Sequence, residues 1–455
     1  MSAAHREAGR GPINLNSPQQ FSAKLPDKVD VVIIGGGIIG VSTALYLAEQ
    51  KKRVFLCEKG RIAGEQSSRN WGWIRQQGRD AAELPLMKEA IQIWQGLARR
   101  CQSKALHFEQ QGIWYLADCE ADLEDFEAFM DIAREHSLDT QILGLDDLQP
   151  HFPKYNRKLL GALHTPSDGR AEPWVAVPAM AKAAEKAGAM IREHCAVRNL
   201  LMSAGTVQGV ITESGSIEAE QVVLAGGAWS SLFAKNSGIN LPQLSVLGCA
   251  ARVEANIDFH SNALDNQLAF RRRLDGGFNI ALCDHHDHHL GPDSFRHSWP
   301  FRQMMLASWR HTHLHLKAPS NFPDGWLTPR HWNPDEVSPF ERQRVLEPIV
   351  DQAVINTMIQ RLKDRFPSAG TARVTHAWAG MIDATPDVVP VIDQLPQLPH
   401  FWIATGFSGH GFGIGPAIGR ILADLLQGKS AKYDMTRFRF NRFSDGSSIV
   451  PGPAL

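Results

Sequence analysis

The chain has 455 residues, of which 43% are hydrophobic and 21% are charged, and its formal net charge is −1. This length exceeds what one hydrophobic core usually serves, so we expect two lobes. A pI near 7.0 excludes the strong basic field that attracts nucleic acid. The six cysteines form no Cys-x-x-Cys pair. Together with the lack of a secretory leader, this favours reduced thiols in a cytoplasmic, soluble protein.

The two ends of the chain differ in composition from the rest. Residues 1–28 are polar, and we expect a flexible N-terminal arm there and a C-terminal tail over residues 431–455. The longest apolar stretch, Val31–Leu47, is interrupted by four glycines. The sequence therefore predicts no segment that crosses a membrane.

A βαβ unit opens the folded part of the sequence. Val31–Ile34 is a short apolar run, typical of a strand that is buried on both faces. Apolar residues then recur at helical spacing from Ile38 to Ala48. Arg53–Cys57 has the composition of a second strand, which closes a unit of about thirty residues. This order predicts an α/β domain of the dinucleotide-binding type.

The loop between the first strand and its helix has the pattern Gly-x-Gly-x-x-Gly. Gly35 permits a tight turn, Gly37 lets a pyrophosphate approach the helix N-terminus, and Gly40 lets the helix pack closely. Glu58 follows the second strand, where a carboxylate can bind both ribose hydroxyls and repel a 2′-phosphate. NAD and FAD both remain possible, and the alternative is a turn that binds nothing. A second glycine-rich strand–turn–helix at Gly406–Gly413 favours FAD, because the flavin ring needs its own anchor.

The rest of the chain alternates strand-like and helical patterns. We expect helices over Trp174–Gly188, Pro339–Phe366 and Pro416–Gln427. We expect strands over Met190–His194, Val207–Thr212, Ile217–Ala225 and Phe401–Ala404. Ala250–Ala318 is rich in arginine and histidine and has an irregular pattern, which suits a second lobe or an elaborated loop. Within it, Asp284–His289 is typical of a metal-binding run, but adjacent histidines cannot all reach one ion, so we expect an exposed loop and no metal.

Four stretches of the sequence resemble the D-amino-acid-oxidase-like superfamily of FAD-dependent oxidoreductases, which includes glycine and sarcosine oxidases. They are Asp30–Gly40, Ser67–Ile74, Val222–Trp229, and Thr385–Asp387 with Gly406–Gly413. Further stretches, among them His194–Arg198 and Trp332–Asp335, resemble bacterial L-amino acid deaminases of that fold. The resemblance extends from Val29 to about Lys429.

This resemblance implies an α/β protein, α+β overall, with two interleaved domains. A Rossmann-like FAD-binding domain is expected over residues 29–95, 150–245 and 368–430. A mixed-sheet substrate-binding domain is expected over residues 96–149 and 246–367. Related proteins with covalent flavin have a cysteine where this chain has Gly380, so we expect FAD to be bound without a covalent link.

The resemblance also implies which residues hold FAD. The first glycines hold the pyrophosphate, Glu58 the ribose, the serine pair the nearby phosphates, and the backbone of Val197 the adenine. Residues 409–413 lie along the pyrimidine edge of the flavin, where the amides of a helix start stabilise negative charge. The full set is Gly35, Gly37, Ile38, Ile39, Gly40, Glu58, Lys59, Ser67, Ser68, Val197, Ala225, Gly226, Trp229, Gly409, His410, Gly411, Phe412 and Gly413.

The reaction implied by the resemblance is oxidation of the carbon–nitrogen bond of an amino acid. Hydride transfer to flavin N5 gives an imine, which hydrolyses to a 2-oxo acid and ammonia. A substrate carboxylate needs an arginine, and the resemblance assigns this role to Arg271, with a solvated basic loop as the alternative. The other residues expected near the substrate are Trp73, Arg75, His410, Ile382 and Asp383. Asp383 either binds a distal ammonium group or caps a turn, and we favour the turn.

Two other functions remain open on the sequence alone. One is an amine or polyamine oxidase without carboxylate recognition, and the other is a flavin-carrying electron-transfer or assembly subunit. The electron acceptor could be oxygen, a quinone or a protein, and stereochemistry and oligomeric state are undetermined. Trp299–Trp326 could form an apolar surface patch in peripheral contact with the inner membrane.

Overall fold

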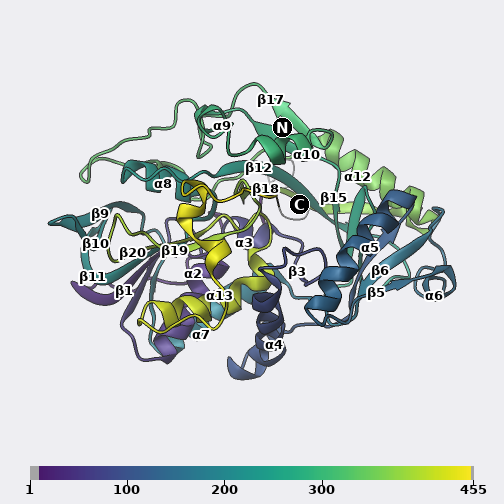
Figure 1. Ribbon diagram of the computed structural model, residues 1–455, viewed down its shortest axis with the longest axis horizontal. Coiled ribbons are helices and arrows are strands. Elements are labelled where there is room, and N and C mark those ends of the chain that lie inside the picture. Colours follow the sequence, from purple (N-terminus) through teal and green to yellow (C-terminus); the bar gives the residue numbers. More distant parts are fainter. Residues whose placement is uncertain (1–9, 452–455) are drawn as a thin grey trace.

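Two large β-sheets organise the chain in the structure, a computed structural model that describes residues 10–451 (Figure 1). The first has eight strands, in the order β19-β20-β11-β1-β2-β8 with β10 and β9 beyond β11. Their bounds are β1 Lys28–Ile34, β2 Val54–Cys57, β8 Met190–Arg192, β9 Val197–Ser203, β10 Thr206–Thr212, β11 Gly215–Leu224, β19 Val391–Gln394 and β20 Phe401–Thr405. The central pairs are parallel, which matches the predicted βαβ unit.

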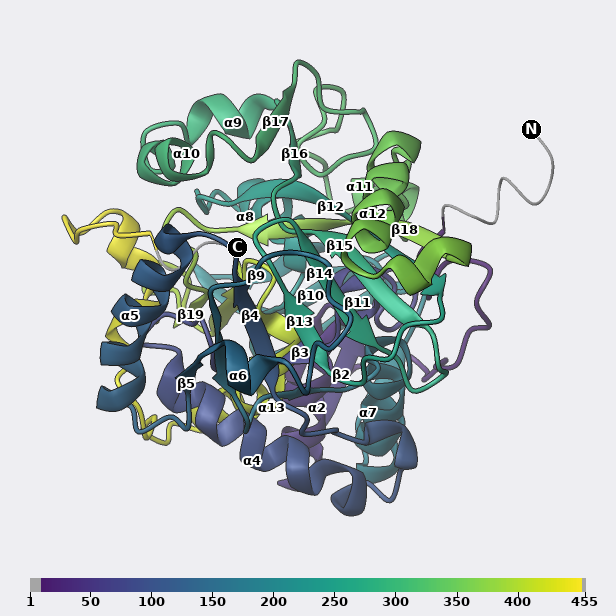
Figure 2. The same cartoon turned by 90° about the vertical axis from the view of Figure 1, so that its right-hand side faces the viewer.

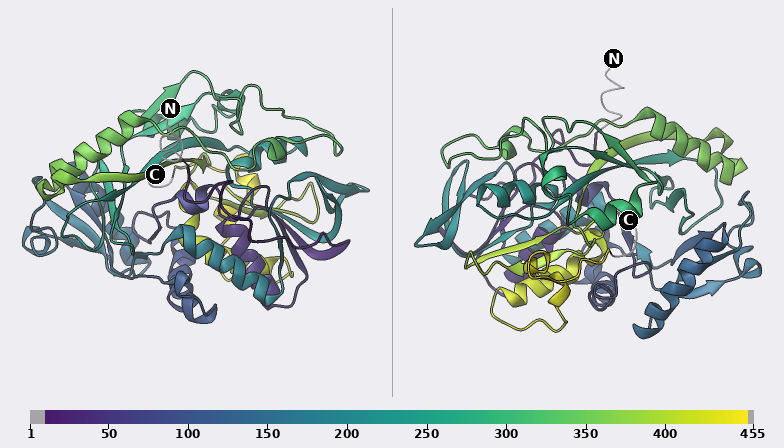
Figure 3. Two further views of the ribbon diagram at one scale, coloured as in Figure 1. Left: turned by 180° about the vertical axis from the view of Figure 1, so that it is seen from behind. Right: turned by 45° about the horizontal axis from the view of Figure 1, so that its top comes forward.

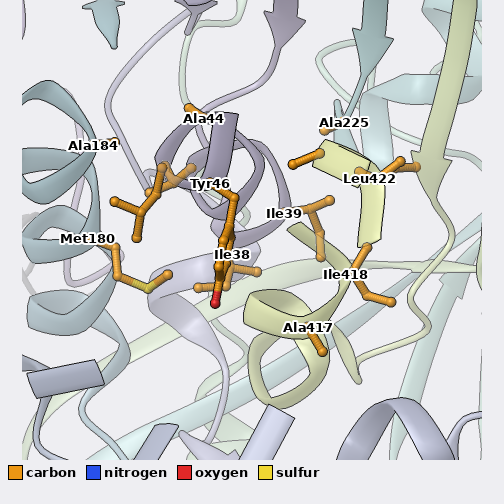
Figure 4. Packing of buried hydrophobic residues seen from close by; sticks show 14 of the residues in the cluster. Ile38, Ile39, Ala44, Tyr46, Met180, Ala184, Ala225, Ala417, Ile418 and Leu422 are labelled. Atoms are coloured by element: carbon orange, nitrogen blue, oxygen red, sulfur yellow. The ribbon is translucent and has the colours of Figure 1, made fainter. Parts of the chain in front are cut away.

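Four helices cover this sheet or pack beside its helices: α2 Ile38–Glu49, α4 Leu84–Arg100, α7 Pro173–Ala187 and α13 Gly411–Leu425. Helix α2 is buried on nearly every side because α7 and α13 flank it (Figure 4). Its unusually apolar sequence follows from this position. A methyl group at Gly419 of α13 would lie 2.4 Å from Cβ of Ser42, so glycine allows the two helices to cross closely.

The second sheet has ten strands, in the order β17-β16-β12-β15-β14-β13-β4-β6-β5, and β18 pairs with β12. The bounds are β4 Ile113–Ala117, β5 Gln141–Leu143, β6 Gly161–Thr165, β12 Leu244–Glu254, β13 Asn262–Leu264, β14 Leu268–Arg272, β15 Phe278–Leu282, β16 His286–His289, β17 Thr312–His315 and β18 Arg373–Ala384. A separate short pair joins β3 Trp73–Ile74 to β7 Gly169–Arg170. Helix α12, Gln352–Arg365, packs against β12, β14 and β15 (Figure 3).

The remaining helices are short, except α5. They are α3 Gln66–Arg69, α5 Glu120–Glu135, α6 Leu145–Leu148, α8 Ser230–Asn236, α9 Pro292–Arg296, α10 Arg302–Ser308 and α11 Pro339–Arg342. Five 3₁₀ turns complete the described chain: Lys104–Leu106, Gly227–Trp229, Pro367–Thr371, Thr436–Phe438 and Phe440–Phe443.

Two strands differ from the predicted division of the chain, because β6 and β18 belong to the second sheet although their residues were assigned to the FAD-binding domain.

Ala250–Ala318 belongs to the second lobe and is not an elaborated loop, since it supplies β13 to β17, part of β12, and the helices α9 and α10. Two predicted helices were wrong in extent. The helix predicted over Pro339–Phe366 is two helices, α11 and α12, separated by an extended segment that contains Pro348, which has no backbone N–H to donate. The helix predicted from Pro416 begins at Gly411 and contains the proline within its early turns.

The histidine tract and the N-terminal arm also differ from expectation. His286–His289 is a strand rather than an exposed loop, and His288 is buried with its ring bonded to the carbonyl of Ser245. Part of the predicted flexible arm is packed, since Phe21 is buried and Ser22 pairs with Arg192 of β8. The tail is also packed, because Arg442 forms a buried ion pair with Asp387 at 2.8 Å. Residues 1–9 and 452–455 lie outside the described residues.

Candidate functional site

A continuous cavity lies between the two sheets. It holds about 2180 Å³ of empty space, including the part open to solvent, and is lined by residues from Ile34 to Phe412. Its walls come from the Gly35 loop, the end of β2, the segment around α3, the loop after β11, and the start of α13. The opposite wall comes from β12, β15, β16 and β18. A cavity of this volume, lined by both glycine segments, fits an adenine dinucleotide.

The backbone of the first glycine loop requires glycine. Gly35 has a φ of +112°, and a methyl group there would lie 2.3 Å from the carbonyl oxygen of Ala225. A methyl group at Gly40 would lie 2.0 Å from the carbonyl oxygen of Gly35, so Gly40 allows helix α2 to start against the turn. Gly37, Ile38 and Ile39 line the cavity, whereas Gly40 acts behind it.

Glu58 lies on the cavity wall where β2 ends. Its two carboxylate oxygens accept hydrogen bonds from the backbone N–H groups of Gly36 at 2.7 Å and Gly60 at 2.6 Å. Burial raises the pKa of Glu58 to about 7, although the charge of Lys59 opposes the shift. These bonds fix the carboxylate beside the glycine loop, where an adenosine ribose would meet it.

The ammonium group of Lys59 interacts with other groups of the protein. Its ammonium lies 2.6 Å from Glu65, donates to the carbonyl oxygens of Gln343 and Arg344, and lies 4.4 Å from the ring centre of Trp229. The side chain therefore ties the segment between α11 and α12 to the adenosine end of the cavity. Val197, Ala225, Gly226 and Trp229 line the same cavity, as does the Gly409–Phe412 segment.

Besides Gly40, two predicted cofactor residues, Ser68 and Gly413, lie away from the cavity. Ser67 lines it and accepts a hydrogen bond from the N–H of Ile38 at 2.9 Å, but Ser68 faces the protein interior and is fully buried. Gly413 contacts strand β3, and its carbonyl accepts a hydrogen bond from Nε1 of Trp94 at 2.9 Å. Ser68 and Gly413 are thus packing positions in this structure.

Arg271 is not on the cavity wall, contrary to its assignment as the carboxylate clamp. Its guanidinium forms two hydrogen bonds of 3.0 Å with Glu172, and both side chains are buried. Arg273 is bonded to Asp275 and lies 4.0 Å from the ring centre of Trp174. A substrate carboxylate would have to displace Glu172 to reach Arg271.

Asp383 holds a turn, as we favoured, although it also lies on the cavity wall. Its oxygen Oδ2 accepts hydrogen bonds from the N–H of Gly406 at 2.8 Å and from the hydroxyl of Thr405 at 3.2 Å. Burial raises its pKa to about 6. The neighbouring Ile382 lines the cavity with its apolar side chain.

The cavity wall near the start of α13 is rich in nitrogen donors. Trp73, Arg75, Arg79 and His410 all line it, and no carboxylate lies within ion-pair distance of either arginine among residues 10–451. Nη1 of Arg79 and Nε1 of Trp73 have no hydrogen-bond partner in that part of the chain. Burial and the neighbouring charge of Arg79 hold the pKa of Arg75 well below its usual range, which a bound anion would reverse.

Sequence reasoning missed several residues of this wall. Arg79 was missed although it follows Arg75 at a spacing of four, and Trp71, which was not among the predicted site residues, also lines the cavity. Cys283, His285 and His286 line the opposite side, because the histidine tract continues from a core strand instead of leaving the fold as a loop. The density of recognition side chains from Arg69 to Arg79 was the one signal available in the sequence.

Comparisons with known proteins agree with this geometry. An L-amino acid deaminase from Proteus myxofaciens, solved with anthranilate, has 29% identity and a TM-score of 0.89, covering 94% of this chain and 97% of that one. Human peroxisomal sarcosine oxidase is 25% identical over 92% of this chain and 97% of its own length. Human dimethylglycine dehydrogenase is 23% identical over 94% of this chain but only 46% of its own, so the chain spans about half of that relative.

No helix within residues 10–451 has both the length and the apolar character needed to span a bilayer.

The family profile described as FAD dependent oxidoreductase matches residues 30–425, which include both glycine segments and nearly the whole cavity. The chain belongs to the DAO family of FAD-dependent oxidoreductases.

Proposed function

We propose that this chain oxidises the carbon–nitrogen bond of an amino acid, giving an imine that hydrolyses to a 2-oxo acid and ammonia. FAD, when bound, supplies the hydride acceptor. The observation that carries the proposal is the pair Arg75 and Arg79, which line the cavity without an acidic partner within ion-pair distance in the described chain. A planar guanidinium binds a carboxylate through two parallel hydrogen bonds.

Arg75 takes the place of Arg271 as the proposed carboxylate clamp. Its guanidinium lies 6.0 Å from the ring centre of Trp73 and 5.6 Å from that of Tyr115, so aromatic faces limit where it can move. The indole N–H of Trp73 is unpartnered in residues 10–451 and offers a further donor to the same anion. These contacts support recognition of an α-carboxylate at this wall.

The two other functions have less support. A polyamine would need a free acid for its distal ammonium, and the carboxylate of Asp383 is engaged by Thr405 and Gly406. A subunit that only carries electrons would have no use for two guanidiniums without acidic partners on the wall of its flavin cavity. The nearby relatives act on amino acids or N-methylated amino acids by name, which favours the same substrate class here.

Anaerobic bleaching of the flavin tests the proposal. The purified protein is mixed with D- and L-amino acids, N-methyl amino acids, and the corresponding amines without a carboxylate, and flavin absorbance is followed. We expect reduction by at least one carboxylated compound and none by its decarboxylated analogue. If no amino acid bleaches the flavin, the proposed function is wrong.

Substitution of Arg75 tests its role directly. Arg75→Met should raise the KM for the best substrate by about tenfold to a hundredfold, because a charged hydrogen-bond pair contributes about 1.5–3 kcal/mol. The control is Arg271→Lys, which keeps a positive charge beside Glu172 and should leave KM nearly unchanged. The opposite pattern would return the clamp to Arg271.

We also propose that the protein contacts an anionic membrane surface peripherally. The segment from α9 to β17 projects from the second sheet (Figure 2) and exposes Trp299, Leu306 and Trp309, with 73%, 75% and 65% of each residue accessible. Arg302 lies 4.2 Å from the ring centre of Trp299, and Arg310 is 5.4 Å from that of Trp309. Apolar side chains flanked by cations favour the interface of an anionic bilayer.

A further inference from the structure

A buried pair of titratable groups lies where α4 and α13 begin, and the proposed function does not yet use it. Glu83 precedes α4 and is fully buried, and His410 precedes α13 and is 5% exposed. Oε2 of Glu83 lies 3.5 Å from Nδ1 of His410. Neither ring nitrogen and neither carboxylate oxygen has a hydrogen-bond partner among residues 10–451.

Four unpartnered polar atoms in one buried place are unusual, because buried polar groups nearly always find partners. The arrangement of the pair indicates what completes it. His410 lines the cavity, whereas Glu83 does not, so the imidazole lies between the carboxylate and the space for substrate. With Nδ1 facing Glu83, Nε2 is the nitrogen left for a ligand.

Oxidation of an amino acid requires the substrate nitrogen to have a free electron pair, because that pair forms the new C=N bond as hydride leaves. At neutral pH an amino acid carries an ammonium group instead. A group in the cavity that takes one proton would therefore make the reacting form available inside the site.

We propose that Nε2 of His410 accepts this proton and that Glu83 is a positioning residue, which orients the ring and stabilises the imidazolium. The proposal rests on the proposed function. One N–H bond of the ammonium breaks, its electron pair stays on the substrate nitrogen, and the proton forms a new N–H bond on His410. The products of this step are a neutral amine and an imidazolium that faces the carboxylate of Glu83.

The surrounding charges link this step to substrate binding. Burial, Arg79 and Arg75 hold the pKa of His410 well below its ordinary value, and Asp80 opposes them. Burial raises the pKa of Glu83 to about 7, the two arginines oppose the shift, and Asp387 adds to it. A substrate carboxylate bound to Arg75 would offset the positive charge and raise the proton affinity of His410 only when substrate is present.

The first test is the pH dependence of anaerobic flavin reduction in His410→Gln and Glu83→Gln. At pH 7 both variants should reduce their flavin about a hundredfold more slowly than the unaltered protein. Their rates should recover as pH rises toward 10, because solvent then removes the ammonium proton. Glu83→Asp keeps a carboxylate and should retain a profile close to that of the unaltered protein. A purely structural defect would not be repaired by raising the pH.

The second test measures binding and needs no turnover. The probe is 2-methylpropanoate, a carboxylate without an amine, whose affinity is followed by the shift it causes in flavin absorbance. If His410 gains a proton when a carboxylate binds, the Kd should rise by up to about tenfold per pH unit between pH 6 and 9 in the unaltered protein. In His410→Gln the Kd should be nearly constant over that range.

Superimposable profiles of His410→Gln and the unaltered protein in both tests would overturn the assignment. This outcome is distinct from failure of the proposed function, in which no amino acid bleaches the flavin of the unaltered protein. Because Glu83 does not line the cavity, Glu83→Gln keeps the assignment testable if the histidine variant loses its flavin.

Discussion

Glu58 shows how one side chain couples folding to cofactor binding. Its pKa is near 7 in the folded chain and near 4.5 when unfolded, because burial penalises the carboxylate. The stability gained from the raised pKa is therefore fully present below about pH 4.5 and is lost as pH rises through 7. At pH 8 the flavin-free protein therefore carries a carboxylate charge at this position, held by the N–H groups of Gly36 and Gly60.

Glu58→Gln removes that charge, which leads to a pH-dependent prediction. The flavin-free variant should resist urea better than the unaltered protein at pH 8, with the difference closing at pH 5. The same variant should bind FAD more weakly, since an amide has one acceptor oxygen and cannot take both ribose hydroxyls. Glu220→Gln, on the exposed face of β11, is the control for both measurements. A stability gap that does not vary with pH would contradict this account.

The residues that could be predicted are those whose role depends on the conformation of the backbone around them. Gly35 and Glu58 follow from the strand–turn–helix pattern, and the structure gives Gly35 the positive φ that the turn needs. Arg271 could not be judged in this way. Its partner Glu172 lies 99 positions earlier, and nothing in the local sequence reveals that the two side chains neutralise each other.

At the level of elements, the first turn of α2 lies very close to the Gly35 turn, and this contact predicts opposite effects for two glycine substitutions. Gly40→Ala places a methyl group against the carbonyl of Gly35, a backbone atom that cannot rotate away. We expect a loss of about 1–3 kcal/mol in the free energy of unfolding and weaker retention of flavin. Gly96→Ala in α4 meets no atom within 4 Å and should stabilise the chain by about 0.5–1 kcal/mol. Urea unfolding of both variants measures the contrast, and equal effects would show that crowding at Gly40 is not the cause.

Elements defined by short-range periodicity were predicted best. The βαβ unit and α7 follow from apolar spacing and a terminal glycine, and Gly188 has the left-handed conformation typical of a helix end. The extended path of the segment between α11 and α12 could not be predicted, because it depends on residues far away in the chain. Lys59 donates a hydrogen bond to the carbonyl oxygen of Arg344, and Gly60 packs against the same carbonyl group. The strand character of the histidine tract likewise depends on pairing with β12 and β17.

At the scale of the whole molecule, the projecting α9–β17 segment makes membrane binding testable. The triple variant Trp299→Ser, Leu306→Ser and Trp309→Ser should lose most of its co-sedimentation with vesicles that contain anionic lipid. Ile349→Ser is the control, because this side chain is exposed to a similar degree but lies between α11 and α12. Binding should weaken as salt rises, since screening reduces the attraction between the arginines and the lipid headgroups. Equal sedimentation of both variants would exclude this surface as the contact.

The division into two sheets could be predicted from length and from the family resemblance, but the assignment of β6 and β18 could not. Both strands leave the chain segments that otherwise build the first sheet and pair across the molecule. For β18 the pairing joins residues more than a hundred positions apart, since its partner is β12, whereas β6 pairs with β4 and β5, which precede it in the chain. Sequence patterns describe which residues form strands, whereas the partner of each strand is fixed by the packing of the complete fold.

The bond from Lys59 to the carbonyl of Gln343 joins residues 284 positions apart. A nascent chain emerging from the ribosome therefore possesses the first strand–turn–helix long before the wall that closes over the adenosine exists. Flavin capture must be a late event in biogenesis, after synthesis has passed α13, whose first residues also line the cavity. Yellow colour in a preparation consequently reports chains that were made to near completion and folded, and truncated products should remain colourless.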